Sequence, residues 1–209
     1  MWFFYAIIYT RSDTMKITLA STSKFKNQIL DTVKIKHNQI SPNCKEHSIY
    51  KDPYEYVKDI ANQKLDSVSN FNTDILISLD TIVLINNKII EKPKTIEEAK
   101  QNLRDSSNNT SKVITGIAML NKITNERVID FQETLITFNQ IDEEDIEFFI
   151  ENEEDAMYAS GFIVETICSN FINKIEIIIF ILTKIINNWS IFRRKINIIY
   201  IQFITSIHY

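Results

Sequence analysis

Asp80 is the most informative charged residue of this sequence, because it stands inside an otherwise apolar run. The run covers residues 75–85 and is interrupted by Ser78 and Asp80. A carboxylate in such a run is costly unless it is paired, binds a metal or stands at the end of a strand. Two interpretations therefore remain open here: Asp80 is a turn residue at a strand end, or it belongs to a functional site.

A second candidate is the polar turn Ser21-Thr22-Ser23, which separates a β-branched run from a helical pattern. A strand that passes through hydroxyl side chains into a helix presents N–H groups and hydroxyls to an anion. Lys26 adds positive charge to this segment, and Lys92, next to Pro93, is another cation beside a fixed turn. Carboxylate, hydroxyls and lysines together suit Mg²⁺-assisted attack on a polyphosphate.

Each of these features also has a purely structural explanation. The hydroxyl turn can be a simple helix cap, and lysines such as Lys24, Lys26 and Lys64 can be solvated surface residues. No histidine has a partner at metal-ligand spacing, so we expect none to be a ligand: they are His37, His47 and His208.

The elements that would position these residues alternate between strands and helices. Asp52-Pro53 predicts a helix start, because Asp favours the cap and Pro the first helical position. Thr95, with Glu98 three residues on, predicts another start through a capping box. Strands are expected over residues 16–21, 35–40, 75–85, 113–120 and 133–138, and further helices over 24–31 and 142–150. Alternating strands and helices predict an α/β fold.

Composition narrows the classes of function. The 209 residues are 44% hydrophobic and 24% charged, as in globular proteins. Lys and Arg number 23 against 27 Asp and Glu, and the net charge of −4 argues against a nucleic-acid partner. Apolar runs fall short of the ~18–20 residues of a membrane span, and no signal peptide is evident. Cys44 and Cys168 cannot form a disulfide framework, so we expect a reducing, cytoplasmic location.

The order of these motifs resembles that of the Maf family of nucleoside triphosphate pyrophosphatases, over residues 16–176. The matching motifs are Leu19-Ala20-Ser21-Thr22-Ser23, Asp52-Pro53, Tyr56-Val57, Ala61-x-x-Lys64, Asp80-Thr81-x-Val83, Lys92-Pro93, Glu97-Glu98-Ala99, Val113-Ile114-Thr115-Gly116, Thr137-Phe138 and Ile146-x-x-Phe149-Ile150. The resemblance implies an α/β fold of the Maf/ITPase kind, with a mixed sheet, helices and two lobes around a cleft, usually as a homodimer. It also implies hydrolysis of a nucleoside triphosphate to the monophosphate and pyrophosphate with a divalent cation, Mg²⁺ or Mn²⁺, as a house-cleaning activity.

The resemblance also assigns roles to individual residues. Asp80 matches the proton acceptor for the attacking water, and Glu46 matches an acidic residue associated with the metal, so Glu46 and Asp80 are the implied metal ligands. Lys26 stands where the family has Arg, which replaces a bidentate group by a point charge. The positions that match phosphate-holding residues are Ser21, Lys26, Lys64 and Lys92.

Three positions that tune base preference in this family disagree here. Phe25 and Glu165 resemble the 7-methyl-GTP branch, whereas Thr81 resembles the dTTP/UTP branch. An aromatic ring can stack on a purine, and a carboxylate can accept N–H donors or favour a cationic methylated base. Two of the three positions therefore favour 7-methyl-GTP.

Three segments are expected along the chain. We expect residues 1–14 to be a non-native extension before Met15, residues 15–176 to form the Maf-like domain, and residues 177–209 to form an aberrant tail. The tail has 13 Ile among 33 residues and lacks Gly, Ala, Val, Asp and Glu, which all use codons beginning with G. Such a composition is typical of AT-rich DNA translated in a wrong frame, and the family's closing Gly-Leu-Pro-like segment is missing after Glu176.

Two alternatives to an active enzyme follow from the tail. One is a catalytically impaired product of a decaying or frame-shifted gene. The other is a membrane-surface protein anchored by this Ile-rich tail, whose basic residues would face acidic lipids: Lys184, Arg193, Arg194 and Lys195.

Overall fold

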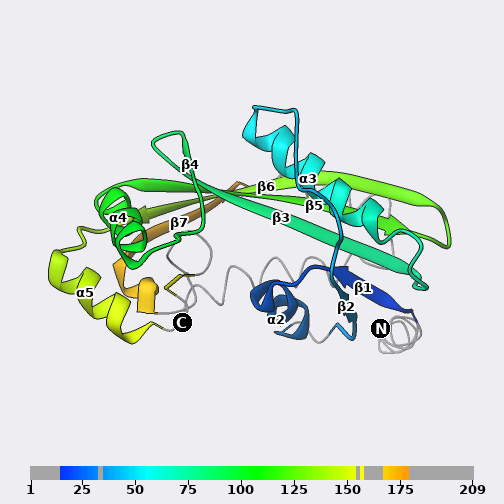
Figure 1. Cartoon of the computed structure of the whole chain (residues 1–209), viewed down its shortest axis with the longest axis horizontal. Coiled ribbons are helices and arrows are strands. Elements are labelled where there is room, and N and C mark those ends of the chain that lie inside the picture. Colours follow the sequence, from blue (N-terminus) through cyan, green and yellow to red (C-terminus); the bar gives the residue numbers. More distant parts are fainter. Residues whose placement is uncertain (1–14, 33–34, 154–155, 158–166, 179–209) are drawn as a thin grey trace, which may run out of the picture. The chain divides into compact units, whose positions relative to one another are not determined.

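The computed structural model describes residues 15–32, 35–153, 156–157 and 167–178 (Figure 1). The elements in chain order are β1 (Ile17–Ala20), α2 (Lys24–Thr32), β2 (Asn38–Ile40), α3 (Pro53–Ser67), β3 (Ile75–Ile85), β4 (Lys88–Ile90), α4 (Ile96–Ser106), β5 (Thr110–Asn121), β6 (Glu126–Phe138), α5 (Glu143–Asn152), η1 (Ile167–Phe171) and β7 (Ile172–Ile178). Residues 1–14 and 179–209, which include the expected extension and nearly all of the expected tail, lie outside the described residues. The last strand runs two residues past the expected boundary at Glu176.

The strands form one mixed sheet, which confirms the expected α/β class. Seven strands are described in it, in the order β2-β1-β3-β5-β6-β7, with β4 paired to β3. β1 pairs in parallel with β2 and β3, whereas β7 is antiparallel to β6. The described residues divide into two compact units. The first contains those up to Asp80 together with Thr115–Gln132, and the second contains those within Thr81–Ile114 and Glu133–Ile178.

The first unit contains β1, α2, β2 and α3 with the adjoining parts of β3, β5 and β6. Strand β1 is buried along its whole length, and α3 packs one largely apolar face into the same core. Helix α3 begins where the sequence predicts: Asp52 Oδ1 accepts hydrogen bonds from the N–H groups of Tyr54 and Glu55, both at 3.0 Å. Pro53 occupies the first turn, where an N–H would have no helical partner.

Strand β2 is shorter than the run predicted over residues 35–40. The backbone N–H of Ile35 donates to the Leu30 carbonyl at 2.9 Å and so closes the end of α2. The His37 ring contacts the Ile35 carbonyl through Nδ1 and Asn27 through Nε2. Because these local bonds occupy residues 35–37, pairing with β1 begins only at Asn38.

The second unit holds α4 and α5 over the adjoining parts of the sheet. Thr95 caps α4 as predicted, with its Oγ1 accepting from the Glu98 N–H at 3.2 Å. The reciprocal half of the capping box differs, because the Glu98 carboxylate accepts from the N–H of Lys94 at 2.6 Å. The long Glu side chain therefore closes the turn one residue before the cap.

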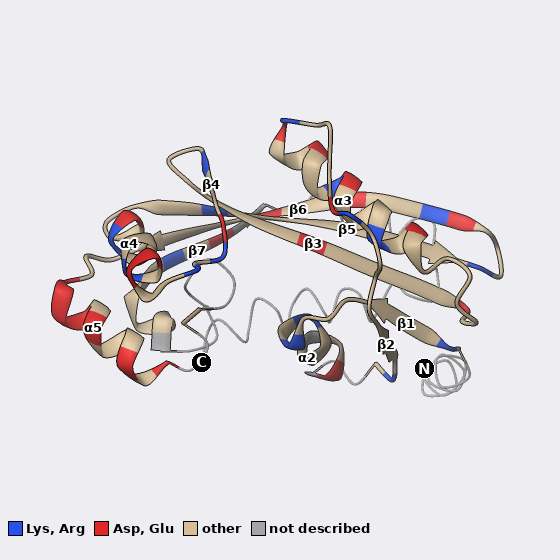
Figure 2. Ribbon diagram, viewed as in Figure 1, with Lys and Arg blue, Asp and Glu red and all other residues tan. Residues whose placement is uncertain are grey.

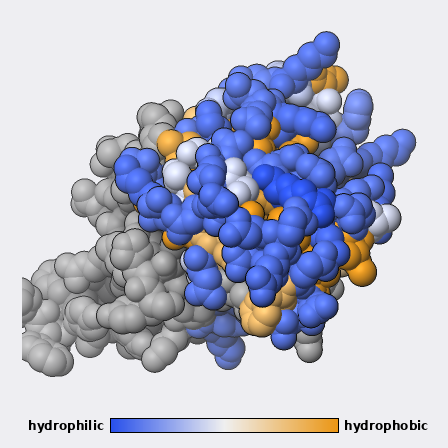
Figure 3. Space-filling model, turned by 90° about the vertical axis from the view of Figure 1, so that its left-hand side faces the viewer, coloured by the Kyte–Doolittle hydropathy of each residue, from blue (hydrophilic) through white to orange (hydrophobic). Residues whose placement is uncertain are grey.

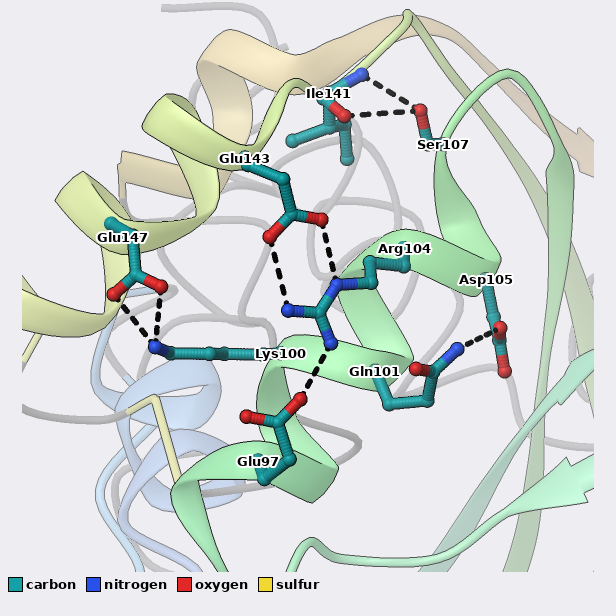
Figure 4. Close-up of polar contacts among 9 residues, drawn as sticks. All are labelled: Glu97, Lys100, Gln101, Arg104, Asp105, Ser107, Ile141, Glu143 and Glu147. Atoms are coloured by element: carbon teal, nitrogen blue, oxygen red, sulfur yellow. Dashed lines mark hydrogen bonds and ion pairs between the residues drawn. The ribbon is translucent and has the colours of Figure 1, made fainter.

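Helices α4 and α5 pack through buried apolar side chains and are also joined by ion pairs at their exposed edge (Figure 4). Arg104 forms a two-bond pair with Glu143 at 2.7 and 3.0 Å and a third bond with Glu97 at 2.7 Å. Lys100 contacts both carboxylate oxygens of Glu147 at 2.5 and 2.6 Å. Figure 2 shows acidic residues along α5, and the face seen in Figure 3 is mostly hydrophilic.

Candidate active site

Asp80 lies in the middle of β3, not at its end, and is that strand's one charged residue (Figure 2). Its side chain is 13% exposed, and Lys64 Nζ donates to its Oδ1 at 2.6 Å. This position excludes the strand-end turn that the sequence left open. Lys64 is likewise no solvated surface residue, because it extends from α3 into the site and is only 9% exposed as a residue.

Glu46 supplies a second carboxylate to the same ammonium group. Its Oε2 lies 3.0 Å from Lys64 Nζ, and its backbone adopts a positive φ of 47° in the segment before α3. Burial by itself lowers the pKa of Lys64, but the charges and hydrogen bonds of Asp80 and Glu46 outweigh it, so the pKa lies above its ordinary value. Lys64 therefore stays an ammonium ion between two carboxylates.

The hydroxyl turn lies at the carboxyl end of β1, next to this ion pair in the sheet. Ala20 is paired with Ser78 in the parallel register, so the residues that follow β1 come out beside Leu79 and Asp80. Ser21 is buried, and its Oγ accepts from the N–H of Ser23 at 3.1 Å. Lys26 Nζ donates to the Leu79 carbonyl at 3.0 Å, which ties helix α2 to the residue before Asp80.

The chemistry of these donors fits a hard divalent cation. Two carboxylates that share one counter-ion can share a metal, and Mg²⁺ commonly takes one or two carboxylates and fills its other positions with water and phosphate oxygens. No group of three or more His, Cys, Asp or Glu side chains suited to a metal occurs within the part of the chain that the structure describes. The site thus offers two protein carboxylates, Glu46 and Asp80, and no closed cage.

Four further residues were predicted to belong to the site. Lys92 and Thr81 belong to the second unit, where both are exposed. Phe25 lies in the first unit with the Lys24 ammonium 4.9 Å from its ring centroid. Glu165 lies outside the described residues. The roles of these four residues stay predictions.

Ser78 and Gly116 contact the helix that carries Lys64, although the sequence assigned neither of them a role in the site. Ser78 Oγ donates to the Ala61 carbonyl of α3 at 2.5 Å, and the backbone of α3 lies directly on Gly116. A signal for Ser78 was present, because it interrupts the same apolar run as Asp80 at a spacing of two, which places both on one face of a strand.

Comparison with known proteins places the chain among nucleotide-hydrolysing relatives. The family model described as "Maf-like protein" matches residues 16–179. A dTTP/UTP pyrophosphatase of Caldanaerobacter subterraneus is 32% identical over 164 residues, covering 78% of this chain and 79% of the relative. A 7-methyl-GTP pyrophosphatase of Aliivibrio fischeri is 30% identical over 163 residues, covering 77% of this chain and 84% of the relative.

A third relative and one solved structure extend the comparison. A dTTP/UTP pyrophosphatase of Pyrococcus furiosus is 33% identical over 185 residues, covering 82% of this chain and 94% of the relative. The solved Ham1 protein of Staphylococcus aureus aligns with a TM-score of 0.41 and 14% identity, covering 59% of this chain and 71% of that chain.

Proposed function

The chain belongs to the family of Maf-like proteins, and from this premise we propose that it is a nucleoside triphosphate pyrophosphatase with Asp80, Lys64 and Glu46 at its active site. The observation that carries the site assignment is the single ammonium group held between two carboxylates, one of them buried in the sheet. Such a cluster resists explanation as a surface ion pair, because Asp80 and Lys64 are both largely removed from solvent.

The reaction consumes one water and one nucleoside triphosphate. Water attacks the α-phosphorus, the bond from that phosphorus to the bridging oxygen breaks, and pyrophosphate leaves with the nucleoside monophosphate as the other product. Asp80 takes the proton of the attacking water. Lys64 holds Asp80 Oδ1 at 2.6 Å, so we assign Oδ2 to the water proton.

The cation and the phosphate contacts belong to the same proposal. Glu46 and Asp80 would hold Mg²⁺ or Mn²⁺, which when bound polarises phosphoryl oxygens and offsets their charge. Ser21 and Lys26 line the turn that follows β1, and they would bind phosphate oxygens there through hydroxyl and ammonium groups. Lys92 has the same proposed role from the second unit.

Two classes of nucleotide are candidates for the preferred substrate, because relatives named for dTTP/UTP and for 7-methyl-GTP both match the chain. Phe25 and Glu165 favour a methylated guanine, through stacking and N–H acceptance, whereas Thr81 favours a pyrimidine. We expect a higher kcat/KM for 7-methyl-GTP than for dTTP or UTP, because two of these three positions favour the purine. Rates on the three nucleotides measure this directly.

Replacement of Asp80 by Asn tests the site. An amide cannot take a proton from water, and loss of general-base catalysis costs about 10²–10⁴-fold in turnover. We expect Asp80→Asn to lose metal-dependent pyrophosphate release by that factor while its circular dichroism stays that of the native chain. Asp66→Asn is the matched control, because Asp66 is an exposed carboxylate on α3 that pairs with Arg127 at 2.7 Å. Near-native turnover of Asp80→Asn would remove Asp80 from the mechanism.

The two alternatives to an active enzyme can be tested separately. An impaired gene product would release no pyrophosphate from any nucleotide. The alternative of membrane anchoring depends on the tail, nearly all of which lies outside the described residues. No helix in the described ranges is both long enough and apolar enough to span a bilayer.

The homodimer and the cytoplasmic location stay predictions. Light scattering measures the first, and cell fractionation measures the second.

A further inference from the structure

We propose that Ser78 and Gly116 are positioning residues that seat helix α3 on the sheet so that Lys64 reaches Asp80, an inference that rests on the proposed function. All the residues concerned lie in the first unit. Neither Ser78 nor Gly116 would touch the nucleotide. They would act through the helix that carries the ammonium group.

Ser78 fixes α3 along the direction of β3. Its side chain is fully buried, and its Oγ donates to the Ala61 carbonyl at 2.5 Å and lies 3.4 Å from the Ala118 carbonyl. Ser78 and Asp80 are two residues apart on one strand, so their side chains leave the same face of the sheet. Ala61 and Lys64 are three residues apart on one helix, so they also share a face. The two bonds therefore run side by side from β3 to α3.

Gly116 fixes the distance between α3 and the sheet. A Cβ at this position would overlap the carbonyl of Val57 and would lie 2.8 Å from the N–H nitrogen of Lys58. Those are backbone atoms of a helix, which cannot move aside without moving the helix. Only glycine lets α3 lie this close to β5.

The three contacts follow one line of the helix. Val57, Ala61 and Lys64 are spaced at i, i+4 and i+7, and they meet Gly116, Ser78 and Asp80 of the sheet. Two of these contacts involve no charge, and the third is the ion pair of the site. A shift of about 1 Å in a supporting element can cost on the order of 10²-fold in rate, so the uncharged contacts set the geometry of the charged one.

A purely structural role for Ser78 explains less. A carbonyl in the middle of a helix already accepts the N–H four residues on, so Ala61 does not need the serine to be satisfied. An alanine at position 78 would avoid burying a hydroxyl at all. The hydroxyl is accounted for if its function is to hold α3 in place.

Kinetics of Ser78→Ala test the inference against a matched control. Ser106→Ala removes another fully buried hydroxyl that donates to a helix carbonyl, that of Asn102 at 2.8 Å, but in α4 of the second unit. We expect Ser78→Ala to lower kcat by roughly 10-fold to 100-fold with KM changed by less than about 3-fold. Ser106→Ala should keep the native kcat. Equal kcat values in the two variants would overturn the inference.

A second measurement needs no activity and so separates this inference from the proposed function. The coupling between Lys64 and Asp80 is measured by urea unfolding of Lys64→Met, Asp80→Asn and the double variant, in three backgrounds: native, Ser78→Ala and Ser106→Ala. We expect the coupling to fall below half its native value only in the Ser78→Ala background. An undiminished coupling there overturns the inference, even if the native chain releases no pyrophosphate.

A further variant, Ser78→Cys, keeps the inference testable if Ser78→Ala does not fold. Ser78→Cys fills the site with a weaker hydrogen-bond donor of similar shape. It should lower kcat and the coupling in the same direction by a smaller factor. Native values of both quantities in this variant would overturn the inference.

Discussion

Two opposing effects act on the pKa of Lys64: burial lowers it, and two carboxylates raise it. The effect of the carboxylates is the larger. Burial disfavours the charged form of Lys64, yet the contacts of 2.6 Å to Asp80 and 3.0 Å to Glu46 raise its pKa above the ordinary 10.5. The contribution of Lys64 to folding stability is therefore fully present below about pH 10.5 and is lost as the pH rises through the folded pKa. Removal of Lys64 would leave Asp80 as a mostly buried carboxylate with no counter-ion.

We expect Lys64→Met to lower the free energy of unfolding by about 3 kcal/mol at pH 7, because breaking a buried pair strands a charge. The difference from the native chain should shrink as the pH rises above about 10.5, because the unfolded chain then loses the Lys64 proton that the folded chain still holds, until the folded pKa is passed as well. Urea unfolding with EDTA from pH 7 to pH 11.5 measures it. Lys58→Met is the control, since Lys58 lies on the same helix but pairs at its surface with the 50%-exposed Glu55. A gap that stays constant with pH would contradict the assigned cause.

Helices and strands differ in how far their own residues determine them. Helix α3 could be predicted to its first residue, because Asp52 and Pro53 act on the turn that follows them. Strands β4 and β7 were missed, since both are held by pairing with β3 and β6 and contain no turn or cap of their own. Asp80 could be singled out as a candidate site residue from its apolar neighbours, although the sequence also allowed a strand-end turn there. Tertiary packing determines that Lys64 is the cation that contacts Asp80. It also determines that Ser78 donates to a backbone carbonyl.

The contact between α4 and α5 shows which forces hold one element to another. Leu103, Ile146 and Phe149 are fully buried in it, and each contributes about 1.5–3 kcal/mol by leaving water. The ion pairs of Arg104 and Lys100 lie at the edge, where solvent and salt screen them. Packing therefore determines the contact, and the ion pairs add a smaller, salt-sensitive part.

Arg104→Gln should lower the melting temperature by about 1–3 °C at low salt, and the difference should largely disappear in 0.5 M NaCl. The hydrogen bond from Arg104 lowers the pKa of Glu143 below its ordinary 4.5, so its contribution is present above that pH and is lost as the pH falls through the folded pKa. Melting curves from pH 7 to pH 3 at two salt concentrations measure both effects. Gln101→Ala is the control, because the Gln101 amide bonds only within α4, to Asp105. Equal salt dependence in the two variants would assign no role to the ion pairs.

At the scale of the whole molecule, we predict that the segment after Glu176 limits the activity of the chain. Its first two residues still pair within β7, opposite Thr134 and Glu133 of β6. The family match extends over residues 16–179 and so covers the proposed site residues. The Ile-rich segment combines high β-propensity with few charges and no proline, which is typical of aggregation-prone sequence.

We expect the 209-residue chain to express poorly, and a chain with a Gly-Leu-Pro-like family C-terminus after Glu176 to be soluble and more active. The physical reason is that the replacement removes the Ile-rich stretches and supplies the family's closing segment, which would cover apolar side chains of the Maf-like domain. Thermal melts and pyrophosphate release on both chains measure the difference. A third chain keeps residues 1–178 and carries a polar Ser-rich segment in place of 179–209, so that removal of isoleucine is separated from restoration of the closing segment. If the natural chain melts cooperatively at the same temperature as the restored one and turns over as fast, residues 177–209 are a legitimate structural element and the frame-shift hypothesis is wrong.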